Sequence, residues 1–102
     1  MQLDNDRYKS DSEIVSSIIR NDADAFKALY YKFYPSLIRF AWYHTYSMEI
    51  AKDLVQEVFI KIWDVRPGLN PNKSIKAYLY KTLSNSIKNY YKNSSRKNIS
   101  FD

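Results

Sequence analysis

The sequence predicts an all-α protein, a compact bundle of about four helices. The 102 residues include only one Gly and three Pro, so residues that form turns are scarce. Apolar residues recur every three or four positions over long stretches, which is typical of helices with one buried face. Three of these stretches directly follow a Ser or Asp that can cap a helix. A chain of this length forms one domain with a single core.

The first helix is expected to start at Ser10, where Ser10 and Glu13 form a capping box. Its apolar residues continue to about Arg20. The preceding residues, 1–9, are polar, and we expect them to be disordered.

The second helix is expected from Ala23 to His44, capped by Asp22. Pro35 lies inside it and removes one backbone donor, so we expect a kink near Tyr31 to Tyr34. A complete break at this point is the alternative.

The third helix is expected from Met48 to Arg66, with Ser47 as its cap. Its buried arc consists of Ala51, Leu54, Val55, Val58, Ile62 and Val65. The opposite arc is acidic and contains Ile60 together with Glu49, Asp53, Gln56, Glu57 and Asp64.

A loop, Arg66 to Ser74, then holds two prolines and the single glycine. The fourth helix is expected from Ile75 to Lys92, with Ile75, Leu79, Leu83, Ile87 and Tyr90 on its core face and Tyr80 at the margin. The helical domain would therefore span 10–93, and residues 94–102 would be a tail or the start of a linker.

Several functional classes have little support in the composition. The chain has no Cys and one His, which excludes disulfides and thiolate metal sites. No nucleophile–base pair, phosphate-binding glycine loop or metal spacing is present, so we expect no enzyme activity, cofactor or metal. No signal peptide or long apolar run is present, and we expect a cytoplasmic protein without a membrane segment.

The charges are unevenly distributed along the chain. The formal net charge is +5, and no acidic residue occurs between Asp64 and Asp102. This favours an anionic partner, nucleic acid first and an anionic membrane surface second. The outer face of the fourth helix combines cations, amides and a ring, as single-strand binding requires: Tyr78, Lys81, Asn85, Lys88, Asn89 and Lys92. The alternative is an ordinary solvated lysine face.

The outer face of the third helix offers a second interface. Ile60 is an apolar residue within an acidic ring, flanked by Phe59 and Trp63. Such a patch is typical of an anchor for a protein partner, and a plain surface is the alternative.

Three segments together resemble a known domain: AFKALYYKFYPSLIRFAW, DLVQEVFIKIW and SIKAYLYKTLSNSIKNYYKN. In this order they are similar to region 2, the N-terminal promoter-melting domain of bacterial sigma factors, most closely the extracytoplasmic-function type. The resemblance covers about residues 11–97. It implies an all-helical bundle that docks on core RNA polymerase and binds promoter DNA.

The resemblance assigns the two faces. The third helix would dock on the clamp helices of the largest polymerase subunit through Asp53, Gln56 and Glu57, with Phe59, Ile60 and Trp63 around them. The loop would help to form a pocket for a flipped-out base of the −10 non-template strand. The DNA-binding candidates are Arg66, Asn70, Asn72, Lys73, Lys76, Tyr78, Tyr80, Lys81, Asn85, Lys88, Asn89 and Lys92. An anti-sigma factor would be a further partner.

The sequence departs from the family in two respects. Ile75 and Tyr78 stand where family members often have Phe and Trp, which leaves the stacking strength open. The second domain that reads the −35 element is absent, so we expect an excised domain. Two other functions remain open: a helical protein-interaction module without nucleic-acid binding, and a duplex DNA-binding regulator.

Overall fold

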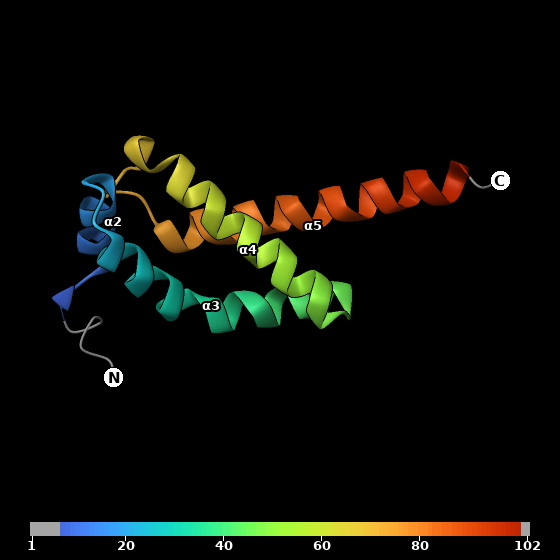
Figure 1. Cartoon of the computed structure of the whole chain (residues 1–102), viewed down its shortest axis with the longest axis horizontal. Helices are drawn as coiled ribbons and strands as arrows, with labels where there is room; N and C mark the ends of the chain where they lie inside the picture. The colour runs from blue at the N-terminus through green and yellow to red at the C-terminus, as the bar shows by residue number, and fades with distance from the viewer. Residues whose placement is uncertain (1–6, 101–102) are drawn as a thin grey trace.

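The computed structural model describes residues 7–100, and it describes side chains as far as Asn93. Within this part of the chain, four α-helices follow one another: α2 (Asp11–Ile19), α3 (Ala23–Thr45), α4 (Met48–Asp64) and α5 (Ile75–Ser100). A single 3₁₀ turn, η1 (Arg66–Gly68), separates α4 from α5. The predicted all-α bundle is confirmed. Figure 1 shows α4 crossing α5 and diverging from α3 after the turn that joins them, with α2 at the end where α3 begins.

Side-chain caps start each of the four helices, as their sequences require. The Ser10 hydroxyl accepts from the backbone N–H of Glu13 at 3.2 Å, and the Asp22 carboxylate accepts from the N–H of Asp24 and Ala25. Ser47 accepts from the N–H of Ile50. These three residues cap their helices as predicted. The return bond expected for the capping box differs, because the Glu13 carboxylate accepts from the N–H of Lys9 at 2.6 Å. A fourth cap, Ser74 at the start of α5, was not predicted and accepts from the N–H of Ala77 at 3.0 Å.

Pro35 lies inside α3 without ending it. The helix is continuous from Ala23 to Thr45, so the complete break left open by the sequence does not occur. The ribbon of α3 changes direction part-way along its length (Figure 1), as a missing backbone donor allows.

The core consists of apolar residues of α2 and α3 together with most of the faces predicted for α4 and α5. The fully buried side chains of largest volume are Ile18, Leu29, Leu37, Ile62, Leu79, Leu83, Val15, Val55 and Val58. Val65 and Tyr90, predicted to be buried, are only half-buried because they lie where α4 ends and where α5 leaves the bundle.

At both ends of the described chain, ordered structure extends beyond the helices that the sequence predicts. Helix α5 continues to Ser100, eight residues beyond the expected end at Lys92, because the polar segment that follows contains no Gly or Pro to stop it. At the other end, Tyr8 donates a hydrogen bond to Asp22 and Arg7 pairs with Asp24, so the predicted disorder does not extend to these residues. The remainder of that prediction, 1–6, lies outside the described residues.

None of the helices that the structure describes is long and apolar enough to cross a membrane.

Candidate nucleic-acid interface and protein-docking face

The loop after α4 is ordered by its own backbone and by one amide side chain. The N–H of Gly68 donates to the carbonyl of Val65 at 2.9 Å, and the N–H of Lys73 donates to the carbonyl of Asn70 at 3.1 Å. The Asn70 side chain accepts from the N–H of Asn72 at 2.9 Å, an Asx turn. Asn70 therefore shapes the loop, and Asn72 and Lys73 are exposed beside it.

A cavity of about 610 Å³ opens between this loop and the first turns of α5. This volume lies in the range of small-molecule sites. Its wall comes from α2, the end of α4, the loop and α5: Val15, Val65, Gly68, Leu69, Asn70, Lys73, Ser74, Ile75, Ala77, Tyr78 and Lys81. The apolar members could contact a flat ring, and the two lysines could neutralise a phosphate beside it.

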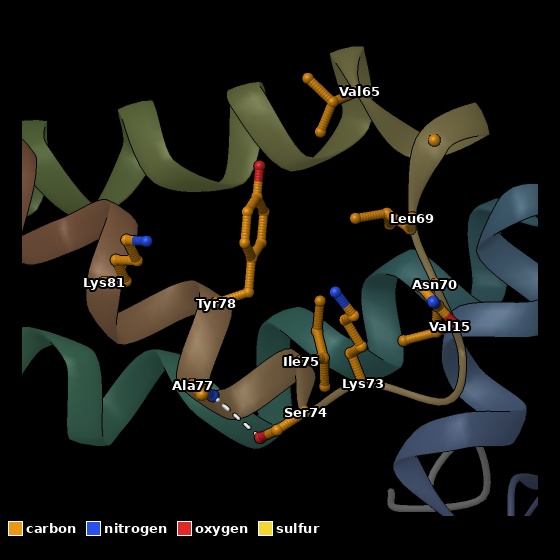
Figure 2. A pocket seen from close by; sticks show the side chains of 11 residues that line it. Val15, Val65, Leu69, Asn70, Lys73, Ser74, Ile75, Ala77, Tyr78 and Lys81 are labelled. Carbon is orange, nitrogen blue, oxygen red and sulfur yellow. Dashed lines mark hydrogen bonds between the residues drawn. The ribbon is translucent and has the colours of Figure 1, made fainter.

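Tyr78 stands at one side of this cavity. Figure 2 shows its ring projecting from α5, with the hydroxyl directed toward α4. The ring is half-buried, so one part of it packs against the protein and the other part is accessible to a ligand. A cavity therefore lies between the loop and α5, and the binding of a base in it stays a prediction.

The cationic face continues along α5 from the cavity. Lys81, Lys88 and Lys92 are exposed, and so are Asn85 and Asn89. From position 78 to position 92 the helix rises by about 21 Å. Lys76 is also exposed, in the first turn of α5, but it lies about 140° around the helix from Lys81 and so outside this face. The other five residues form one solvated surface, with the cavity at its N-terminal end.

Tyr80 does not lie on this face. Its ring packs edge-on against Phe40 of α3, with the ring centroids 5.3 Å apart, and it is half-buried. Tyr80 therefore joins α5 to α3, and its role as a DNA contact stays a prediction. Tyr80 follows Tyr78 by two residues, so the two side chains are about 200° apart around the helix axis.

The side chain of Arg66, which the sequence predicts as a DNA contact, is held by other residues of the protein. Its Nε donates to Asn21 Oδ1 at 2.7 Å, and its guanidinium lies 3.9 Å from the centroid of the Trp63 ring. The group is turned toward the α2–α3 turn instead of toward the cationic face.

On α4, Asp53, Gln56 and Glu57 are exposed as predicted, and Ile60 is 59% exposed. Phe59 is only 2% exposed. Its assignment as a contact for a partner is therefore corrected, since it lies in the core beneath this face.

A shallow cavity of about 240 Å³ lies beside Ile60 between α4 and α3. Its lining residues are Phe26, Tyr30, Gln56, Phe59, Ile60, Trp63 and Asp64. Trp63 is half-buried and meets Phe26 edge-on, with the centroids 5.1 Å apart. We call the exposed residues Asp53, Gln56, Glu57 and Ile60, together with this cavity, the α4 face.

Sequence reasoning did not place Phe26 and Tyr30 at this surface. The signal that could have found them is their position directly after the core residues Ala25 and Leu29, one helical turn apart. Burial raises the pKa of the Tyr30 hydroxyl above its ordinary value, and the neighbouring Tyr34 adds to this. The half-buried Tyr30 side chain still carries a hydroxyl that can donate a hydrogen bond to a partner.

Comparison with known proteins gives three matches. A model of the family described as Sigma-70 region 2 matches residues 29–97. The RNA polymerase sigma factor YlaC of Bacillus subtilis (strain 168) is 28% identical over 69 residues, which are 68% of this chain and 40% of YlaC. The chain thus spans about two fifths of that curated relative. An engineered region 2 of sigmaE, solved in complex with GTAAAA, has a TM-score of 0.78 and 25% identity, covering 86% of this chain and 92% of the other.

Proposed function

The chain belongs to the Sigma-70 region 2 family, and we propose that it acts in transcription initiation as the domain that docks on core RNA polymerase and binds the −10 non-template strand. The observation that carries the proposal is the cavity of about 610 Å³ at the start of the cationic face of α5. A pocket for one base, followed by cations for the next phosphates, is what capture of a single strand requires.

The likeness to a DNA-bound structure supports this proposal. An engineered sigmaE region 2 of the same fold was solved in complex with GTAAAA. In this chain, the loop 66–74 and α5 supply a comparable combination of an apolar cavity and exposed lysines. Extruding a base costs a few kcal/mol of stacking, and stacking on Tyr78 would offset part of that cost.

The α4 face is the proposed docking surface for polymerase. Its acidic and amide residues suit a basic coiled coil, which we take to be the clamp helices of the largest subunit. Ile60, more than half exposed beside the Trp63 cavity, would supply an apolar anchor. The domain would work in the cytoplasm, where polymerase and promoter are, and an anti-sigma factor could compete for either surface.

The domain boundaries are part of this proposal. Residues 10–93 would form the region 2 unit, and the segment 94–102 would lead toward a second domain that reads the −35 element. The helical continuation of α5 to Ser100 supports a rigid start for such a connection.

A gel-shift experiment tests the proposal. Single-stranded and duplex fragments of a −10 element are compared, each with and without core polymerase. We expect preferential, salt-sensitive binding of the single strand, strengthened by polymerase. Binding of duplex without polymerase would instead favour a duplex regulator, and polymerase binding with no DNA retained would favour a protein-interaction module.

A further inference from the structure

Three contacts hold the Arg66 side chain in one place. Its Nε donates to Asn21 Oδ1 at 2.7 Å, and one terminal nitrogen donates to the main-chain carbonyl of Trp63 at 2.5 Å. Its guanidinium carbon lies 3.9 Å from the centroid of the Trp63 ring. A planar group that stacks and donates in two directions uses what distinguishes Arg from Lys.

The acceptor for Arg66 is itself held firmly. Asn21 has a left-handed backbone with φ of 69°, and its N–H donates to the carbonyl of Ile18 at 2.8 Å. The next residue, Asp22, caps α3. The Asn21 amide therefore sits at a fixed point between two helices, where Arg66 can anchor to it.

The backbone of Arg66 begins one wall of the base cavity. The N–H of Leu69 donates to the Arg66 carbonyl at 3.2 Å, and the N–H of Gly68 donates to the Val65 carbonyl at 2.9 Å. Val65, Gly68 and Leu69 all line the cavity. A shift of Arg66 would therefore move the wall.

The other neighbour of Arg66 belongs to the α4 face. Trp63 lines the shallow cavity there and meets Phe26 edge-on. The Arg66 side chain therefore contacts Trp63, which belongs to the proposed polymerase surface. The Arg66 backbone begins the loop that belongs to the proposed DNA surface.

We infer that Arg66 is a positioning residue, which fixes the wall of the base cavity by joining it to Asn21 and to the Trp63 ring. This inference rests on the proposed function, in which the cavity binds a base.

The test uses Arg66→Lys and Asn21→Gly, alone and together, and Arg66→Gln as the variant that removes the charge. Lysine retains the charge but cannot stack flat and donate in both directions. Glycine removes the Asn21 amide and still adopts a positive φ. Amide hydrogen exchange of Gly68 and Leu69 is measured, together with affinities for a GTAAAA single strand and a scrambled single strand over a range of salt concentrations.

We expect each single variant to speed exchange at Gly68 and Leu69 by roughly tenfold, because hydrogen bonds to a charged group are lost. Preference for GTAAAA over the scrambled strand should fall, and the dependence of affinity on salt should stay unchanged. The double variant should be little worse than either single variant.

The opposite pattern would overturn the inference. If Arg66→Lys keeps both the amide protection and the preference, while Arg66→Gln lowers the salt slope by about 0.7, Arg66 is a phosphate ligand. A wild-type domain with no preference among strands would count against the proposed function. The exchange rates would still decide the role of Arg66 in the loop.

Discussion

The hydroxyl of Tyr91 on α5 donates a hydrogen bond to the main-chain carbonyl of His44 in the last turn of α3. The last carbonyls of a helix have no partner within that helix, so Tyr91 satisfies one of them from outside. Beyond it, Tyr46 caps the C-terminal end of α3 in a left-handed conformation with φ of 54°. The bond connects residues 47 positions apart and holds α5 against α3 where α5 begins to leave the bundle.

Removing this hydroxyl should destabilise the domain slightly. We expect Tyr91→Phe to lower the free energy of unfolding by about 0.5–1.5 kcal/mol, the net value of one such hydrogen bond. Urea unfolding followed by circular dichroism measures it. Tyr43→Phe is the matched control, because Tyr43 is 68% exposed and its change should have little effect. Equal losses for the two variants would show that the His44 contact adds nothing.

Tyr78 should contribute to strand binding by stacking. We expect Tyr78→Ala to weaken binding of a −10 single strand by about 1–3 kcal/mol, whereas Tyr78→Phe should keep most of the affinity because the ring remains. Tyr78→Trp should strengthen binding if the larger ring fits the cavity. Fluorescence anisotropy with labelled single strands provides the affinities. A Tyr78→Ala variant with wild-type affinity would remove Tyr78 from the site.

The exposed lysines should act through charge alone. Lys81→Gln and Lys88→Gln should each reduce the slope of log affinity against log salt by about 0.7, the value for one phosphate contact with a single strand. Lys52→Gln on α4 is the control, exposed but away from α5. If Lys52→Gln changes the slope equally, the lysines of α5 contribute only general charge.

The α4 face should determine binding to polymerase. We expect Gln56→Ala to weaken binding of core RNA polymerase and Glu57→Lys to abolish it, because a lysine would repel a basic partner. Lys27→Ala, also on an exposed helix position, is the control. Binding is measured by pull-down with core polymerase and helicity by circular dichroism. Unchanged binding with intact helicity would refute the docking assignment.

The helices and their buried faces could be predicted from the sequence because each depends on local signals. Ser10, Asp22 and Ser47 were recognisable as caps, and the core face of α4 followed from apolar spacing. Phe59 was misplaced because it lies at the edge of that spacing, and only the position of α3 shows that Phe26 and Tyr30 cover it.

The candidate site was less predictable because it depends on contacts between distant segments. The sequence shows Arg66 only as a cation in a basic stretch. Its hydrogen bond to Asn21 cannot be predicted from the sequence, because the two residues are 45 positions apart. Tyr80 likewise meets Phe40 only after α3 and α5 have packed. Charge and periodicity identify which residues face outward. They cannot identify which of these side chains form contacts with other residues of the same chain.

Asp22, the cap of α3, should make the free energy of unfolding depend on pH in the acidic range. Burial alone would raise the pKa of Asp22, but hydrogen bonds from Tyr8, Ala25 and Asp24 outweigh it and lower the pKa below the ordinary 3.8. The folded state therefore favours the ionised carboxylate. Its contribution is complete above the ordinary pKa and is lost as the pH falls through the lower folded value.

We expect Asp22→Asn to reduce the loss of unfolding free energy between pH of about 5 and about 2, because Asn can still cap the helix but does not titrate. Tyr8→Phe should have a similar, smaller effect, since it removes one of the hydrogen bonds that lower the pKa. Urea unfolding over this pH range gives the comparison for wild type and both variants. Identical acid profiles for wild type and Asp22→Asn would mean that other carboxylates control the acid sensitivity and that the capping carboxylate titrates normally.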